Sequence, residues 1–168
     1  MPAGAHGTVI GMAAGLGDRA GYGPTSVNIV AYGSLMCRGS LESALGRPAA
    51  LTKVTVPGWR RVFNAAFGEY AYLNLRPDPG AAIEAAYFEM DAAELPRFAE
   101  REAGSELTEV APGYLAFVWP EAHCRELPVL SSYVAICRRG AAELGLDLGA
   151  ATDWPLIVVD DAGNPAYR

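Results

Sequence analysis

Hydrophobic and polar positions along the chain predict several short strands separated by turns. Residues 27–32 are rich in β-branched and aliphatic side chains and end at Gly33, and residues 51–56 alternate apolar and polar positions. The same strand character recurs at residues 59–67, 70–75, 83–90 and 114–119. Because Gly and Pro residues separate these stretches, we expect about six strands joined by turns.

Three further segments show helical spacing. Ser40 is expected to cap a brief helix over residues 41–45. A longer helix is expected to begin at a serine cap, at position 131 or 132, and to end at Gly145. A third helix is expected over residues 94–103.

The order of these elements indicates the fold class. Strands and helices do not alternate strictly, so a doubly wound parallel sheet is not indicated. The pattern favours one α+β domain over residues 27–168, built on a small, mostly antiparallel or mixed β-barrel flanked by a few helices. Residues 1–26 are rich in Gly and Ala without a sustained period, and we expect a flexible leader there. Within it, residues 15–21 are one residue too long for a dinucleotide-binding fingerprint, and no strand precedes them.

Composition narrows the classes of partner. The 168 residues are 51% hydrophobic and have a formal net charge of −6, so the basic stripe that nucleic-acid binding requires is not expected. The uninterrupted apolar run near the N-terminus covers residues 9–17, too short to span a membrane. Three dispersed cysteines and two histidines lack the paired spacing of a zinc site. We therefore expect a cytoplasmic protein with a metal-free site, and cysteines buried as small hydrophobic residues.

The first place where chemistry is expected is the segment after the first strand, residues 32–36. Gly33 allows a sharp turn close to a ligand, and successive backbone N–H groups in such a turn form a concave anion site. The Ser34 hydroxyl adds a donor. An ordinary strand-to-loop turn has the same sequence, so the alternative stays open on the pentapeptide alone. Ser34 is not expected to be an acyl-enzyme nucleophile, because the G-x-S-x-G elbow is absent.

The second place is Glu102. A helical projection at about 100° per residue puts Glu102 between Leu95 and Phe98, on the apolar stripe, whereas Glu100 points to the opposite, solvated side. Burial would raise the pKa of the Glu102 carboxyl towards the range of a general acid or base. The alternative is that the helix frays at Gly104 and that Glu102 reaches water.

At these two positions the sequence resembles the γ-glutamylcyclotransferase-like superfamily. Residues 32–36 match its Y-G-S-[LN]-[LM] loop in full, and residues 101–104 with Val110 fit its R-E-A-G-Y-x-R-x-x-V frame without a gap. Residues 57–64 and 72–75 look like its second and third strands. Residues 132–133, 139–141 and 165–168 look like its closing helix and tail, so the similarity spans about residues 28–168.

The resemblance implies a reaction without a cofactor or metal. A γ-glutamyl substrate attacks its own γ-carbonyl with its α-amine, closing 5-oxoproline and expelling an amine, amino acid or peptide. By resemblance, Glu102 is the general acid and base. The substrate would contact Tyr133 and the loop residues Tyr32, Gly33, Ser34, Leu35 and Met36, with N–H groups of residues 33–35 binding the carboxylate and the oxyanion. A small-molecule γ-glutamyl partner is thus expected.

Two positions depart from the family pattern. Ser105 stands where the family often has Tyr, and Leu107 where it often has Arg. Tyr133, Tyr72 or Tyr114 are the residues that can replace the missing tyrosine. The departures also motivate an alternative reading, in which the chain is a small-metabolite binding module on the same fold with weak or no catalysis.

Overall fold

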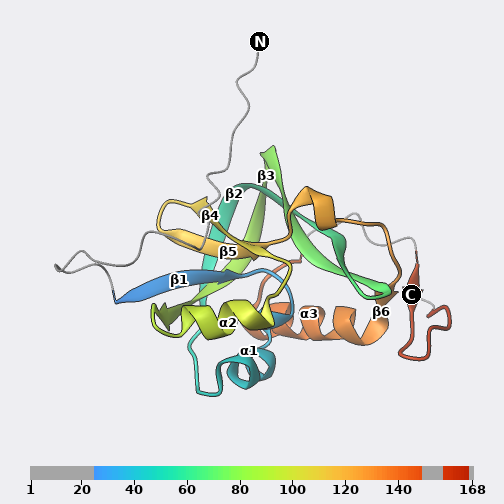
Figure 1. Cartoon of the computed structure of the whole chain (residues 1–168), viewed down its shortest axis with the longest axis horizontal. Coiled ribbons are helices and arrows are strands. Elements are labelled where there is room, and N and C mark those ends of the chain that lie inside the picture. The colour runs from blue at the N-terminus through green and yellow to red at the C-terminus, as the bar shows by residue number, and fades with distance from the viewer. Residues whose placement is uncertain (1–24, 149–156, 167–168) are drawn as a thin grey trace, which may run out of the picture.

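A curled mixed sheet with helices packed against it forms the body of the computed structural model, which describes residues 25–148 and 157–166 (Figure 1). The sheet has five strands in the order β2-β3-β1-β5-β4, with β1 parallel to β5 and the other neighbours antiparallel. Its strands are β1 (Ser26–Ala31), β2 (Thr52–Phe67), β3 (Tyr70–Asp91), β4 (Glu106–Ala111) and β5 (Tyr114–Val118). The expected α+β fold with a mixed, barrel-like sheet is thereby confirmed.

Helices and a small second sheet complete the described part. The α-helices are α1 (Arg38–Leu45), α2 (Leu95–Arg101) and α3 (Ser131–Leu144), which lie below the sheet in the view of Figure 1. Two short 3-10 helices are η1 (Ser34–Met36) and η2 (Glu121–His123). The second sheet pairs β6 (Val129–Leu130) with β7 (Val158–Val159) in parallel.

Two of the expected turns lie inside long strands. Pro57-Gly58 lies within β2 and residues 76–80 within β3, with Trp59 paired to Pro77 next to a bulge. The prediction that these prolines end strands was wrong because β2 is an edge strand and β1 pairs only with residues 86–91 of β3. A proline whose nitrogen faces an open edge breaks no ladder hydrogen bond, and Gly58, with φ of 81°, adopts the left-handed conformation at the bulge.

The helix boundaries differ from the expected ones in two places. The third helix, α3, runs to Leu144 and is closed by Gly145 in the left-handed conformation, as predicted. However, α1 begins at Arg38, so Ser40 lies inside the helix and is not its cap. The helix α2 ends at Arg101, which leaves Glu102 as the residue after its last turn.

Strand β4 was not predicted from the sequence, because its glutamates lower the β character of a short segment.

The largest hydrophobic cluster lies between the sheet and the helices. Phe98 of α2 packs between Phe88 of β3 and Phe117 of β5, with ring centroids 6.0 and 5.5 Å away. Phe98 is buried, as are Ile29 and Met36. The stack fixes α2 against the sheet about one turn before Glu102, which places the end of this helix near the ends of β1 and β5.

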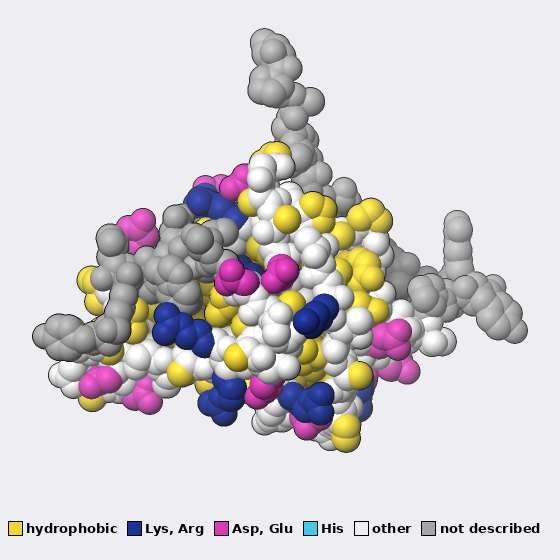
Figure 2. Space-filling view, turned by 180° about the vertical axis from the view of Figure 1, so that it is seen from behind, with side chains coloured by type: hydrophobic (Ala, Val, Ile, Leu, Met, Phe, Trp, Pro, Cys, Tyr) yellow, Lys and Arg dark blue, Asp and Glu magenta, His cyan; other side chains and the backbone are white. Residues whose placement is uncertain are grey.

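The start of the described chain and the surface of the molecule can be compared with the predictions from composition. Strand β1 begins at Ser26, one residue inside the expected leader, and residues 1–24, with the segment 15–21, lie outside the described residues. On the face seen in Figure 2, basic side chains are interspersed with acidic and hydrophobic ones. Within the described ranges, no helix is both long and apolar enough to cross a membrane.

Candidate functional site

A cleft of about 610 Å³ opens where the bend after β1, the end of α2, the end of β5 and the start of α3 meet. Glu102 and the bend residues Tyr32, Gly33, Ser34 and Leu35 line the same cleft. Its other lining residues are Val30, Ala31, Ser40, Phe67, Tyr72, Leu73, Glu100, Arg101, Ala103, Phe117, Trp119, Tyr133 and Ile136. The structure therefore brings together the two places that the sequence singled out, which are about 70 residues apart along the chain.

The bend offers backbone donors to the cleft. The Met36 N–H donates to the Gly33 carbonyl oxygen (3.0 Å) and the Cys37 N–H to the Ser34 carbonyl oxygen (3.1 Å), which closes the turn η1. In the described part of the chain, the N–H groups of Ser34 and Leu35 have no acceptor, as expected for the first residues of a helical turn. These two donors are therefore available to an anion. Met36 differs from the other predicted contact residues, because its side chain is fully buried in the core and does not line the cleft.

A buried arginine that the sequence analysis did not identify holds the bend in place. Arg61 of β2 is 1% exposed and donates from Nε to the Tyr32 carbonyl oxygen (2.7 Å) and from Nη2 to the Glu84 carbonyl oxygen (2.5 Å). Burial lowers its pKa to about 10, so the guanidinium stays charged at neutral pH. Arg61 is next to Arg60 in an ordinary strand segment, and only the three-dimensional contact with Tyr32 reveals its role.

Helix α3 supports the bend from the other side. A Cβ atom on Gly140 would lie 2.3 Å from the backbone nitrogen of Cys37, closer than atoms can approach. Glycine at this position therefore allows the helix backbone to touch the loop backbone. A Cβ atom on Gly33 would lie 3.0 Å from the Tyr133 hydroxyl oxygen, so the bend also fits closely against the first turn of α3.

Two tyrosines present buried hydroxyl groups at the cleft. The Tyr32 hydroxyl donates to the Phe117 carbonyl oxygen, and burial together with the negative charge of Glu102 raises the Tyr32 pKa. The Tyr133 hydroxyl accepts the Leu73 N–H (3.2 Å), and its pKa is likewise raised by burial. Tyr72 packs edge-on against Tyr133, with ring centroids 4.9 Å apart. Both hydroxyl groups thus stay protonated and act as neutral polar groups.

Glu102 faces the cleft from the end of α2. Its N–H donates to the Phe98 carbonyl oxygen (3.2 Å), and its own carbonyl oxygen accepts the Ser105 N–H (3.0 Å) and hydroxyl (2.6 Å). The side chain is 22% exposed, and its carboxylate contacts the Arg101 guanidinium. Burial raises the pKa of the Glu102 carboxyl, and the charge of Arg101 opposes part of that rise. The helix thus ends at Arg101, three residues before the Gly104 at which the alternative reading had it fray, and the Glu102 side chain is not in bulk water.

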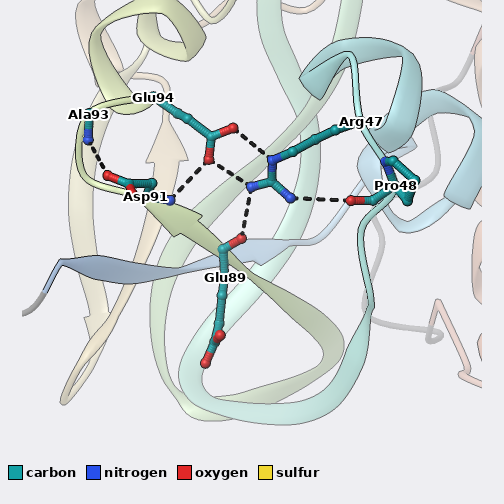
Figure 3. Close-up of polar contacts among 6 residues, drawn as sticks. All are labelled: Arg47, Pro48, Glu89, Asp91, Ala93 and Glu94. Atoms are coloured by element: carbon teal, nitrogen blue, oxygen red, sulfur yellow. Dashed lines mark hydrogen bonds and ion pairs between the residues drawn. The ribbon is translucent and has the colours of Figure 1, made fainter.

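An ion pair fixes the other end of α2 (Figure 3). Arg47, after α1, donates from Nε and Nη2 to the two carboxylate oxygens of Glu94, both at 2.7 Å. Glu94 Oε2 also accepts the Asp91 N–H (3.0 Å), and Arg47 Nη2 reaches the Glu89 carbonyl oxygen (3.4 Å). The hydrogen-bonded guanidinium lowers the pKa of Glu94 to about 2. The helix that presents Glu102 is therefore tied to both α1 and the end of β3.

The structure also places the residues that depart from the family pattern. Ser105 supports the backbone of Glu102, as described above, and Leu107 packs at the edge of the core. Of the three tyrosines considered as replacements, Tyr72 and Tyr133 line the cleft, whereas Tyr114 packs on Tyr87 (5.1 Å between ring centroids) and does not line it. Among the described residues, no group of three or more His, Cys, Asp or Glu side chains is placed to hold a metal ion.

Solved structures show which fold this arrangement belongs to. A γ-glutamyl cyclotransferase superimposes with a TM-score of 0.60 at 17% identity, over 73% of this chain and 82% of that one. The crystal structure of an uncharacterized protein from Homo sapiens gives a TM-score of 0.59 at 17% identity, over 74% of this chain and 83% of that one. YkqA from Bacillus subtilis gives 0.54 at 16% identity, over 70% of this chain but only 49% of its own length.

Comparison of sequences alone adds no assignment, since no protein-family model and no curated protein matches this chain. At such low identity the structural likeness concerns the fold alone. The curled mixed sheet and the order of the helices nevertheless agree with the resemblance seen in residues 32–36 and 101–104. The chain has the γ-glutamylcyclotransferase-like fold.

Proposed function

We propose that the protein is a cyclotransferase acting on a γ-glutamyl compound, with Glu102 as its general acid and base. The observation that carries the proposal is the shared cleft: a mostly buried carboxyl with a raised pKa lines the same cavity as the free N–H groups of Ser34 and Leu35. One small molecule that places an amine near Glu102 and an anionic oxygen near the bend would use both features.

The proposed reaction uses both features of the cleft. The substrate enters with an α-ammonium group, and the Glu102 carboxylate accepts one of its protons. The freed amine attacks the γ-carbonyl carbon, and the five-membered ring closes within one molecule, so the enzyme's main task is to hold the folded chain. The N–H groups of the bend stabilise the negative oxygens of the substrate. Protonated Glu102 then returns its proton to the departing nitrogen as the amide bond breaks. The ring nitrogen gives up its second proton through the Glu102 carboxylate to the same departing amine, so the products are 5-oxoproline and a protonated amine.

A second candidate function is binding without turnover. The observation that favours it is the contact between the Arg101 guanidinium and the Glu102 carboxylate, which occupies the group that an ammonium would need. A binding module would keep the cleft and the bend but would release no product.

A product assay separates the two functions. The protein is incubated with a panel of γ-glutamyl compounds that includes glutathione, γ-glutamyl-alanine, γ-glutamyl-lysine and γ-glutamyl-ethylamide, and 5-oxoproline is measured by mass spectrometry. The enzyme is expected to release 5-oxoproline, and Glu102→Gln is expected to lose at least about 100-fold in rate while still binding ligand. Binding across the panel without 5-oxoproline would establish the module instead.

The chain offers a matched control for this variant. Glu100 also lines the cleft, although the helical projection put it on the side opposite Glu102, but it is exposed whereas Glu102 is mostly buried. Glu100→Gln removes the same charge and is expected to change the rate less than about threefold with γ-glutamyl-ethylamide, whose leaving group carries no charge for Glu100 to repel. A large loss in Glu100→Gln with little loss in Glu102→Gln would show that Glu102 does not transfer the protons.

A further inference from the structure

The outer part of the cleft is lined by apolar and aromatic side chains. Phe67, at the tip of the β2–β3 hairpin, is 64% exposed and lines the cleft all the same. Tyr72, Trp119 and Ile136 contribute to the same cavity. Large hydrophobic residues gain free energy when a ligand removes them from water, so an exposed phenylalanine at the rim of a cavity is a contact surface for an apolar group.

The charged side chains that line the cleft do not favour the binding of a carboxylate. Among the described residues that line it, Arg101 is the only lysine or arginine, and its guanidinium already contacts Glu102. Glu100 and Glu102 add two carboxylates. The free N–H groups of the bend suffice for the α-carboxylate and the oxyanion of the γ-glutamyl part. A second carboxylate, on the leaving group, would therefore lie next to apolar side chains and acidic groups without a partner, which is costly.

We propose that the leaving group is a hydrophobic amine without a carboxylate, such as an arylalkyl amine, rather than an amino acid or peptide. This inference rests on the proposed cyclisation and specifies its substrate class. In the reaction the γ-amide C–N bond breaks and a new C–N bond to the α-nitrogen forms. The α-ammonium group loses two protons, and both end on the departing nitrogen, which leaves as an ammonium ion. The apolar wall at Phe67 and Trp119 binds the side chain of that amine.

Four substrates test the two parts of the proposal separately. γ-Glutamyl-phenethylamide and γ-glutamyl-phenylalanine differ only in a carboxylate on the leaving group, and γ-glutamyl-ethylamide and γ-glutamyl-alanine are the corresponding pair without the ring. We expect the value of kcat/KM for the phenethylamide to exceed that for γ-glutamyl-phenylalanine at least about tenfold because of the unpaired charge. We expect it to exceed that for the ethylamide by a similar factor because of the ring.

The outcomes distinguish the inference from the function on which it rests. If none of the four compounds yields 5-oxoproline, cyclisation itself is overturned, and the leaving-group assignment with it. If 5-oxoproline forms but γ-glutamyl-phenylalanine or γ-glutamyl-alanine is used as well as its amide partner, the enzyme stands and the inference is overturned. Equal use of the phenethylamide and the ethylamide would overturn the assignment of the apolar wall.

Variants at the rim add a structural check. Phe67→Ser is expected to lower kcat/KM for the phenethylamide by about fivefold or more and to leave the ethylamide within about twofold. Ile157→Ser is the control, because Ile157 is also an exposed large hydrophobic residue, 55% exposed, but does not line the cleft. Phe67→Arg supplies a cation at the rim and is expected to raise γ-glutamyl-phenylalanine relative to the phenethylamide. No change in this ratio would contradict the charge argument.

Discussion

At the scale of single residues, two neighbouring features of the structure act in opposite directions on the pKa of Glu102. Burial at the end of α2 raises its pKa, and the adjacent Arg101 guanidinium pulls the pKa back. A group that must first accept and later donate a proton works best when its pKa lies near the working pH. The balance between burial and Arg101 therefore sets the pH range of the proposed reaction.

This balance predicts a shift in the pH profile of Arg101→Gln. Catalysis requires the Glu102 carboxylate, so kcat/KM rises as the pH rises through its pKa. Removing the cation removes an influence that lowers the pKa, so the pKa rises further and the acidic limb of the profile moves to higher pH. The measurement is kcat/KM against pH for both proteins. Arg97→Gln, which removes an exposed cation from the same helix, is the control and should leave the acidic limb in place. An acidic limb that moves to lower pH in Arg101→Gln would contradict the assignment of this limb to Glu102.

At the scale of elements, the bend after β1 is held by contacts from two directions. Arg61 of β2 fixes the Tyr32 carbonyl oxygen, and α3 lies against Cys37 at Gly140. Backbone donors act on a ligand only if their direction is fixed beforehand. The contact between α3 and the bend is therefore expected to matter for both stability and activity.

Gly140→Ala tests this contact. A Cβ atom there would lie 2.3 Å from the Cys37 nitrogen and 2.5 Å from the Met36 carbonyl carbon. Because both of these atoms belong to the backbone, the helix and the bend must move apart. We expect a loss of about 1–3 kcal/mol in the free energy of unfolding, measured with urea, and a fall in kcat/KM as the bend shifts.

Gly39→Ala is the matched control for this helix glycine. Gly39 lies inside α1, and nothing is within 4 Å of its added Cβ atom, so the same change is expected to be neutral or to stabilise by about 0.5–1 kcal/mol. If Gly140→Ala behaved like Gly39→Ala in both measurements, α3 would not hold the bend.

At the scale of the whole molecule, local sequence patterns located the residues that share the cleft better than they located the ends of the strands. The loop at residues 32–36 and the acid at 102 are recognisable because each belongs to a short sequence motif, and residues 32–35 line one cleft with Glu102. The unbroken lengths of β2 and β3 were not predictable, because whether a proline ends a strand depends on which neighbour the strand has. Arg61 and Gly140 could not be found either, since each acts through a contact with a segment far away in the sequence.

The ion pair between Arg47 and Glu94 is such a long-range contact, and it makes the stability of the whole fold depend on pH. The pKa of Glu94 is lowered to about 2 in the folded protein, so its contribution is present above the unfolded value of 4.5 and is lost as the pH falls towards 2. Both side chains are about one-third exposed, and solvent screening limits the contribution of the ion pair to about 1 kcal/mol.

Glu94→Gln is therefore expected to lower the free energy of unfolding by about 1 kcal/mol at pH 7. The difference from the parent protein should shrink steadily below pH 4.5, and urea unfolding at several pH values measures it. Glu89→Gln, whose carboxylate points away from Arg47 in Figure 3, should change little, and a difference for Glu94→Gln that stays constant with pH would show that the pair does not couple the fold to protonation.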